Sequence, residues 1–586
     1  MSVLIVIKPS GTKIRVREKT LLSDALNKAG LSPGLYCQGR GVCGKCAVEI
    51  LEGKLPNYAS GEKELLGRLG LSDRHRLACR HVAESDLCLR IPESALPGRI
   101  SVVEFGPEVA LPFEPTVKKY AVSAARSEDD VSETDNLFRR LGAASLRVPL
   151  DVLRKGPAVR KRSGDLLTAV VAEERDLIDI EPGDTTGRVF GLAFDVGTTT
   201  LAAAAVDLAT GRVLSRNACL NGQTAYGADV ISRINLVLEK PGRAETLRKA
   251  VLSDLAGLAE TVMSSAGIAG TEVYAAGIAG NTVMSHLLLG LPVESLAVAP
   301  FASTFTSLPV LSPSEAGLRF LHPEAPVYIA PNIRSFIGGD TSAGLVASGF
   351  VRLKGPALYI DLGTNGEIVL KSGRDFAATS TAAGPAFEGM NISCGMLART
   401  GAICRVEPEG DAFRYLTVDD APARGLCGTG LIDMAALSLE RGLMAPTGAI
   451  ATAKKTLPLI RGLSLNQKDI RELQLAVGAL RTGMRMMLDA HGLRSRELKA
   501  IFVAGAFGSR LSIDNSVALG LLPDIPASRF RFLGNASLSG AVALLLSVPA
   551  RRAIEETARA VRHLSLASQP GFQDVYISSL KFKKWS

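Results

Sequence analysis

Four cysteines in the first part of the chain have the types and spacing to hold a metal cluster. Cys37, Cys43 and Cys46 lie within the glycine-rich stretch YCQGRGVCGKC, and Cys79 follows later in the stretch RLACR. Four thiolates can ligate a two-iron, two-sulfur cluster, with two ligands for each iron. Glycine accepts positive φ without strain, so the stretch can curve tightly around such a cluster. We therefore predict a [2Fe–2S] cluster at these four cysteines.

Two other uses of these cysteines fit the spacing less well. A structural zinc site usually takes two separate short cysteine pairs, whereas here three cysteines share one loop and the fourth stands apart. A redox-active Cys-x-x-Cys pair would account for Cys43 and Cys46 but would leave Cys37 and Cys79 unexplained. These residues, with the strand-like AVEIL after Cys46, resemble ferredoxins of the two-iron type, in the branch with five residues in the first gap. The resemblance covers about the first 95 residues and implies a β-grasp fold.

A second pattern that can carry chemistry occurs twice in the rest of the chain. FDVGTTT around Asp195 and IDLGTNG around Asp361 each combine an apolar strand, Asp-x-Gly-Thr and a second apolar strand. The carboxylates can reach Mg²⁺ directly or through water, and glycine and threonine can offer donors to phosphate. One such motif is usually a hairpin turn, but two at matched positions predict two related halves with a nucleotide between them. The predicted ATP and Mg²⁺ site has Asp195 and Asp361 as catalytic residues, and Gly197, Thr198, Thr199, Gly363, Thr364, Asn365 and Gly366 as binding residues.

A third element is also repeated. EVYAAGIAGN begins at Glu272 and LKAIFVAGAFGS begins at Leu498, and each reads as a strand followed by a turn rich in small residues. In the second copy Gly505, Ala506 and Gly508 leave room for a flat ring above the backbone, although small residues also serve close packing of a strand and a helix. FDVGTTT, IDLGTNGE and VAGAFGS resemble the first phosphate, second phosphate and adenosine motifs of the actin-like ATPase superfamily. This resemblance implies ATP between two lobes, and the Gly-Lys-Ser/Thr loop of P-loop ATPases is absent.

The elements that must position these residues divide the chain into several domains, because its length exceeds what one core usually holds. Prolines recur before residue 117, and no helical period survives there, which predicts an extended linker. In the middle we expect strands at 117–121, 166–172 and 176–180, and a helix at 132–141 capped by Ser132. The expected fold class is multidomain α/β: a β-grasp ferredoxin domain at 1–95, a linker at 96–116, a small α+β domain at 117–188 and a two-lobed actin-like ATPase domain at 189–586.

The composition limits the classes of function. Hydrophobic residues make up 47% of the chain and charged residues 21%, which is typical of a globular protein. The start has no signal-peptide pattern, and no apolar run approaches the roughly 18 residues of a membrane helix. The net charge of +9 is modest, and the single Trp and short basic runs do not favour nucleic acid. We expect a cytoplasmic protein that binds neither membrane nor nucleic acid.

The order of the parts provides a further resemblance along nearly the whole chain. A two-iron ferredoxin, a linker, a small middle domain and an actin-like half with STAAGPAFEGMNISCGM and GGDTSAGL are similar to the reductive activators of corrinoid-dependent methyltransferase systems. The family implies that one electron from the cluster restores Co(I) from inactive Co(II) in the corrinoid of a partner protein, using ATP. It also implies a reductase that reloads the cluster, and a homodimer.

Three alternatives remain at this point. The chain can be another ATP-driven, low-potential electron donor, similar to the activators of acyl-CoA dehydratases, although these carry a four-iron cluster between two subunits and no ferredoxin domain. It can be a small-molecule kinase with a regulatory cluster domain. It can also be a simple electron carrier with a degenerate ATPase half, which the presence of both Asp195 and Asp361 argues against.

Overall fold

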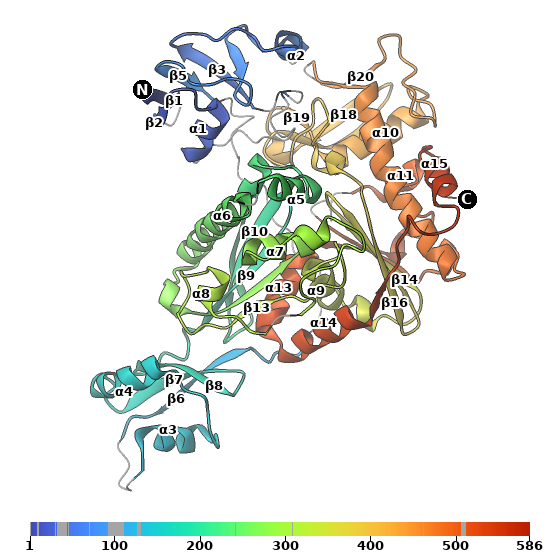
Figure 1. The fold of residues 1–586 in the computed structure, drawn as a ribbon. Helices are drawn as coiled ribbons and strands as arrows, with labels where there is room; N and C mark the ends of the chain where they lie inside the picture. The colour runs from blue at the N-terminus through green and yellow to red at the C-terminus, as the bar shows by residue number, and fades with distance from the viewer. Residues whose placement is uncertain are drawn as a thin grey trace.

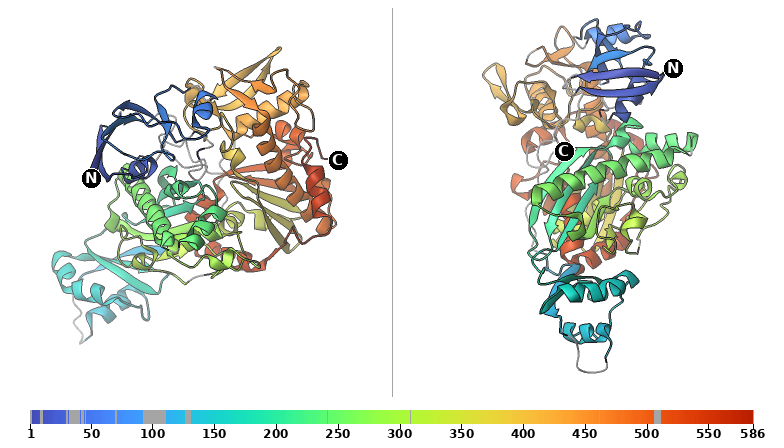
Figure 2. Two further views of the ribbon diagram at one scale, coloured as in Figure 1. Left: turned by 45° about the horizontal axis from the view of Figure 1, so that its top comes forward. Right: turned by 90° about the vertical axis from the view of Figure 1, so that its left-hand side faces the viewer.

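The chain folds into four parts spread over an elongated molecule. In this computed structural model the N-terminal domain lies at one end, two large lobes form the centre, and the small middle domain lies at the other end (Figures 1 and 2). Among the residues that the structure describes, no helix has the length and apolar character needed to cross a membrane. The described residues are 2–8, 11–29, 31, 41, 44, 46–68, 71–91, 111–125, 131–240, 242–307, 309–460, 462–505 and 511–585.

The N-terminal domain has the predicted β-grasp fold. Its elements are β1 (Ser2–Lys8), β2 (Thr12–Arg17), α1 (Leu22–Lys28), β3 (Ala47–Glu52), α2 (Glu62–Arg68), β4 (His75–Leu77) and β5 (Leu87–Arg90). The sheet order is β2-β1-β5-β3-β4, and β1 and β5 are parallel. Alternation along β1 buries Val3, Ile5 and Ile7 in one core with Leu26 of α1. This core supports the end of the sheet where Cys46 and Cys79 lie.

The middle domain is a three-stranded antiparallel sheet with two helices. Its elements are β6 (Val117–Ser123), α3 (Glu133–Leu141), α4 (Leu150–Arg162), β7 (Leu166–Ala172) and β8 (Asp176–Pro182). The predicted strands and helix are confirmed, and Ser132 caps α3 by accepting a hydrogen bond from the backbone N–H of Asp135. Helix α4 was not expected, because it continues through Gly156 and Pro157, which usually interrupt a helix.

The two lobes contain sheets with the same strand order, which confirms the predicted repeat. The strands are β9 (Phe190–Val196), β10 (Thr200–Asp207), β11 (Val213–Leu220), β12 (Val273–Gly280) and β13 (Val327–Ile329) in the first, and β14 (Ala357–Leu362), β15 (Gly366–Ser372), β16 (Asp375–Thr381), β22 (Ala500–Ala504), β23 (Phe530–Gly534) and β24 (Val561–His563) in the second. The orders are β11-β10-β9-β12-β13 and β16-β15-β14-β22-β23, with β24 beside β16. Strands β9 and β14 each end near an Asp-x-Gly-Thr turn. Each pairs antiparallel with the strand that follows it, β10 or β15. Each also pairs in parallel with the strand of the other repeated element, β12 or β22.

Helices cover these sheets and join the lobes. They are α5 (Val230–Glu239), α6 (Arg243–Ala266), α7 (Thr282–Leu289), α8 (Pro313–Ala316), α9 (Gly339–Ala347), α12 (Ile513–Leu519), α13 (Ala536–Leu546) and α14 (Val548–Ala560). Helix α6 packs on β10 and β11, and α13 packs on β9 and β12. Because α13 follows β23 of the second sheet along the chain, it ties the second lobe to the first. Helices α9 and α13 pack closely against each other.

An accessory subdomain extends the second lobe on the side of the N-terminal domain (Figures 1 and 2). It comprises β17 (Ala402–Glu409), β18 (Ala412–Thr417), β19 (Gly425–Leu426), α10 (Gly428–Glu440), β20 (Thr456–Pro458), β21 (Ser464–Asn466), α11 (Gln467–Ala490) and α15 (Phe572–Ser579). Helix α11 also packs on β15 and β16, so it connects the subdomain to the central sheet of the second lobe.

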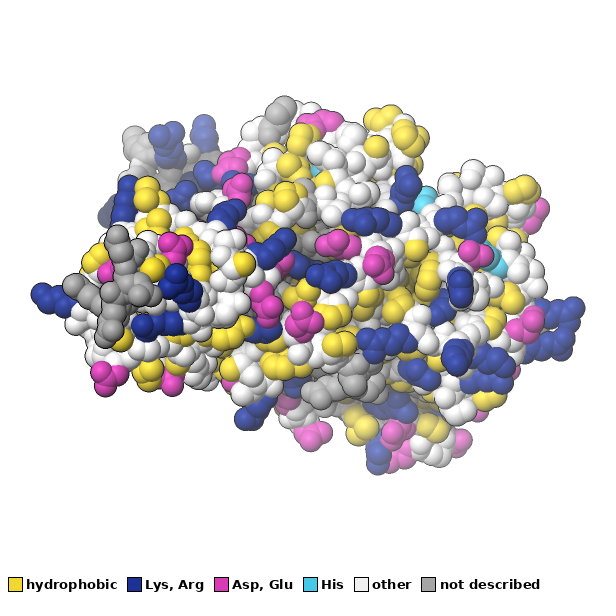
Figure 3. Space-filling model, turned by 90° about the horizontal axis from the view of Figure 1, so that it is seen from below, with side chains coloured by type: hydrophobic (Ala, Val, Ile, Leu, Met, Phe, Trp, Pro, Cys, Tyr) yellow, Lys and Arg dark blue, Asp and Glu magenta, His cyan; other side chains and the backbone are white. Residues whose placement is uncertain are grey.

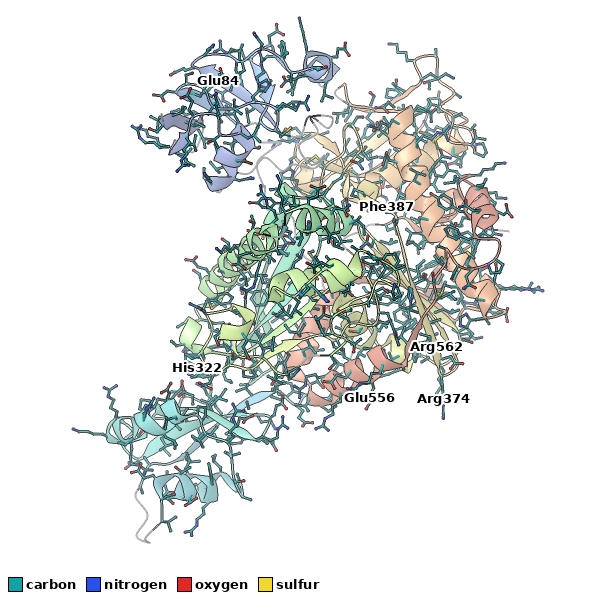
Figure 4. All side chains as sticks on the ribbon, in the orientation of Figure 1. Glu84, His322, Arg374, Phe387, Glu556 and Arg562 are labelled. Carbon is teal, nitrogen blue, oxygen red and sulfur yellow. The ribbon has the colours of Figure 1, made fainter. Side chains whose placement is uncertain are left out.

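The middle domain is attached to the first lobe by a shared apolar core, which includes Val117, Val170 and Ile178, and by polar contacts. The backbone N–H groups of Glu114 and Thr116 donate to carbonyls at the end of α13. The Glu173 carboxylate lies 2.5 Å from the Arg551 guanidinium of α14. His322, at the end of the first lobe nearest the middle domain in Figure 4, contacts that domain through the Asp179 carboxylate of β8.

On the face of the molecule shown in Figure 3, basic and acidic side chains are interspersed with apolar ones.

Candidate functional site

Two of the four predicted cluster cysteines are described, and they lie together. Cys46 immediately precedes β3 and Cys79 follows β4, and these strands are paired. Their Sγ atoms are 3.3 Å apart and buried. A disulfide would require about 2.05 Å, whereas two thiolates at about 2.3 Å from one tetrahedral metal ion lie about 3.8 Å apart. The pair therefore fits two ligands of one iron; Cys37 and Cys43 lie outside the described residues.

A buried carboxylate holds the turn that carries Cys79. Glu62, at the start of α2, accepts hydrogen bonds from the backbone N–H groups of Ala59 and Leu77, at 2.7 and 2.6 Å. Its Oε2 atom also lies 2.7 Å from Nε2 of His81. Since Leu77 and His81 flank Cys79 on both sides, Glu62 restrains the direction of that thiol. The sequence offered no signal for this role beyond an acidic residue at a helix start.

The two Asp-x-Gly-Thr turns meet at the junction of the lobes. Oγ1 of Thr199 lies 3.2 Å from Oγ1 of Thr364, although 165 positions separate them in the chain. Both side chains are buried. Next to Thr199, the Thr198 hydroxyl accepts a 2.9 Å hydrogen bond from Asn281, and its carbonyl accepts one from the fully buried Arg233. The turns are therefore in direct contact, as a site shared by two lobes requires.

Two asparagines hold the first turn while capping helices. Asn535 accepts a hydrogen bond from the backbone of Leu538 in α13, and its Nδ2 donates to Asp195 at 2.8 Å. Asn281 similarly caps α7 while donating to the turn. Ser537 adds a 2.7 Å hydrogen bond to the other oxygen of Asp195. The repeated Gly-Asn pair after β12 and β23 was the signal in the sequence, and its role was not predicted.

Four carboxylates gather behind the turns. Burial, reinforced by Asp340 and Asp195, raises the pKa of Asp361 to about 8. Burial also raises the pKa of Asp340 to about 7, with a contribution from Asp195, and holds the pKa of Glu367 well above its usual range. In the described part of the chain, no three His, Cys, Asp or Glu side chains lie close enough to ligate one ion directly. These raised pKa values favour protonated carboxyls when no cation is near, and a nearby cation would favour their ionised forms. Mg²⁺ keeps much of its hydration, so the cluster fits a hydrated Mg²⁺.

The predicted glycines have different local roles. A Cβ on Gly197 would lie 2.5 Å from the Thr200 carbonyl, so the first turn requires glycine. A Cβ on Gly363 would meet only the Asn365 carbonyl, at 3.5 Å. Gly505 has φ +105° and lies against the carbonyl of Leu362 on the neighbouring strand, which supports close packing at this position. Gly366 packs against α11, and Ala506 and Gly508 lie outside the described residues.

Three buried charged residues at the junction were missed by sequence reasoning. Asp340 lies in the first turn of α9, within the quoted GGDTSAGL stretch. Glu388 ends the short helix η5 (Pro385–Glu388) and accepts hydrogen bonds from Thr364. Arg233 of α5 donates to the carbonyl of Thr198 in the first turn and to that of Gly227, shortly before α5. Burial raises the pKa of Glu388 to about 7 and lowers that of Arg233 to about 9. Asp340 and Glu388 lie in the stretches that carried the family resemblance, but nothing in those stretches indicated a role at the junction, and no motif marks Arg233.

Comparisons with known proteins agree with this geometry over the full chain. Residues 5–84 match a 2Fe-2S iron-sulfur cluster binding domain, 108–187 the RACo linker region, 190–352 the RACo middle region, and 355–585 the C-terminal ASKHA domain of RACo. A solved structure, a reductive activator for corrinoid, iron-sulfur protein, has 32% sequence identity and a TM-score of 0.76, covering 99% of this chain and 98% of that one. The chain belongs to the family of reductive activators of corrinoid proteins.

Two curated relatives support the same assignment of this activator. The corrinoid activation enzyme RamQ of Eubacterium limosum is 30% identical over 601 residues, which is 97% of each chain. The [Co(II) methylated amine-specific corrinoid protein] reductase of Methanosarcina barkeri is 31% identical over 280 residues, covering 44% of this activator and 51% of the relative. The expected family and fold class are therefore confirmed.

Proposed function

We propose that this activator uses ATP to return one electron to the corrinoid of a partner protein in a methyltransferase system. When bound, the [2Fe–2S] cluster supplies the electron and ATP with Mg²⁺ supplies the free energy. Cys37, Cys43, Cys46 and Cys79 would hold the cluster. The reaction takes one electron to convert Co(II) of the partner's corrinoid to Co(I), with no atom transferred. A reductase outside this chain then restores the electron.

The observation that carries the ATP requirement is the contact between Thr199 and Thr364. A one-electron step that is uphill by about 100 mV costs about 2.3 kcal/mol. A nucleotide can offset this cost only if it binds two conformations of the chain with different affinity. Phosphate held by both turns has such a preference, because it interacts with both lobes at once. Asp195 and Asp361 would orient the hydrated Mg²⁺ beside that phosphate.

The decisive experiment follows Co(I) absorption after the reduced activator is mixed with a Co(II) corrinoid protein. We expect Co(I) to form with ATP and Mg²⁺, and to form much more slowly without them. The Asp361→Asn variant should keep its cluster absorbance and lose the ATP effect. Equal Co(I) formation without ATP would instead support a simple electron carrier.

The same assay separates the remaining alternatives. ATP hydrolysis stimulated by a sugar or a small acid, and not by the corrinoid protein, would support a kinase. ATP-dependent reduction of an acyl-CoA dehydratase without any Co(I) formation would support a dehydratase activator. We also infer that the activator works in the cytoplasm as a homodimer; light scattering that gives the mass of one chain would contradict the dimer.

A further inference from the structure

Glu388 links the two phosphate turns to a different part of the second lobe. Both of its carboxylate oxygens lie 2.8 Å from Oγ1 of Thr364, which in turn contacts Thr199 of the first lobe. Glu388 is therefore the end of a short chain of hydrogen bonds that starts in the other lobe.

The segment 389–396 continues from Glu388 into the accessory subdomain. Asp469 of α11 accepts hydrogen bonds from the backbone N–H and the hydroxyl of Ser393, at 2.7 and 2.6 Å. Cys394 and Met396 form backbone hydrogen bonds with Leu426 of β19. This subdomain lies beside the N-terminal domain (Figures 1 and 2). A shift of segment 389–396 would therefore displace the side of the accessory subdomain that lies beside the N-terminal domain, where the electron enters.

The short helix η5 has a glycine with positive φ at each end. Gly384 and Gly389 precede and follow it, with φ of +75° and +73°, in the left-handed region that favours glycine. Phe387, labelled in Figure 4, is buried in the core of the second lobe. Phe387 therefore anchors the helix directly next to Glu388.

Phosphate at the turns would compete with Glu388 for the same donor. A threonine hydroxyl has one proton and donates it to one acceptor at a time. If the Thr364 hydroxyl donates to a phosphate oxygen, the Glu388 carboxylate loses that hydrogen bond and faces a like charge. Glu388 would then keep only the Thr364 backbone N–H and the Thr199 hydroxyl as donors. Because losing a donor is costly for a buried carboxylate, a change in the position or the partners of Glu388 would be favoured.

We propose that Glu388 is the positioning residue that transmits occupancy of the phosphate turns to the segment 389–396. The inference rests on the proposed function, because it takes the phosphate of ATP as the occupant. The charged side chain near Glu388 at the junction is that of Arg233, from the first lobe.

Hydrogen exchange of peptides within 389–396, measured with and without ATP and Mg²⁺, tests the proposal. We expect a nucleotide-dependent change in the full-length protein, and loss of most of it in Glu388→Gln, whose amide can donate to phosphate. This variant should bind ATP about tenfold more tightly, since a like-charge contact is removed, and should produce fewer Co(I) per ATP hydrolysed. Glu407→Gln is the matched control: Glu407 pairs with Arg414 on the surface of the same subdomain, and its replacement should change none of these quantities.

A second variant changes the glycine that precedes η5 without touching the turns. Gly384 has open space around its Cα, so Gly384→Ala adds backbone strain alone. We expect an altered exchange response in 389–396 with an ATP affinity within about threefold of the original, because the turns are unchanged. An unchanged exchange response and ATP affinity in Glu388→Gln would overturn the proposal while leaving ATP-dependent Co(I) formation intact. Loss of the response in Glu388→Gln, with no Co(I) formed by the original protein, would support the coupling and refute the proposed function.

Discussion

Replacing Gly540 with alanine should push apart the two helices that join the lobes. A Cβ at this position of α13 would lie 2.7 Å from the carbonyl carbon of Ala343 on α9, and 3.0 Å from its Cα. Carbon atoms in contact are normally about 3.5–4.0 Å apart, so α9 and α13 must separate by about 1 Å. Overpacking of this kind costs about 1–3 kcal/mol of unfolding free energy.

The same separation should impair ATP hydrolysis. Asp340 lies at the start of α9, whereas Asn535 and Ser537 at the start of α13 hold Asp195. Moving the helices apart therefore moves Asp340 relative to Asp195. A misplacement of about 1 Å can cost up to about 100-fold in rate. We expect ATP hydrolysis by Gly540→Ala to fall by about 10- to 100-fold, with the cluster absorbance unchanged.

Thermal unfolding and ATP hydrolysis, each compared with a matched variant, check this reasoning. Gly257 lies at an exposed position of α6, and no atom lies within 4 Å of a Cβ added there. Gly257→Ala should stabilise the protein by about 0.5–1 kcal/mol, because alanine favours the helix. Gly540→Ala should melt at a lower temperature than the original protein. If it instead melts at the original temperature and hydrolyses ATP at the original rate, the close packing of α9 and α13 does not position the site.

Three further substitutions test other parts of the molecule. Cys79→Ser should remove most of the visible cluster absorbance but preserve ATP binding, and retained absorbance would argue against the ligand assignment. Burial raises the pKa of Asp254 to about 6, so the folded state loses stability as pH rises from about 4 to 6. Asp254→Asn should therefore raise the melting temperature more at pH 8 than at pH 4.5. The control Glu260→Gln, at an exposed position, should show no such difference. Glu173→Gln should cost about 3 kcal/mol by leaving the Arg551 guanidinium without its carboxylate, and limited proteolysis should then release the middle domain faster.

Several features followed from the sequence because they depend on residues that are close together in the chain. The strand-like AVEIL after Cys46 and the apolar runs of the middle domain predicted strands, and Ser132 marked the start of α3. The repeat around Asp195 and Asp361 predicted two related lobes, since each copy carries its own strand and turn. Helix α4 was missed, because the packing of Val152 outweighs the local effect of Gly156 and Pro157.

Other features were decided only by the tertiary structure. The contact of Thr199 with Thr364 and the approach of Cys46 to Cys79 require chain segments that are distant in sequence. The role of Glu388 depends on the same folding, because it acts on a turn 24 positions earlier. The sequence by itself determined which chemical groups the protein carries and which strands present them. The tertiary structure decided which of those groups meet, because hydrogen bonds and charge repulsion act through space.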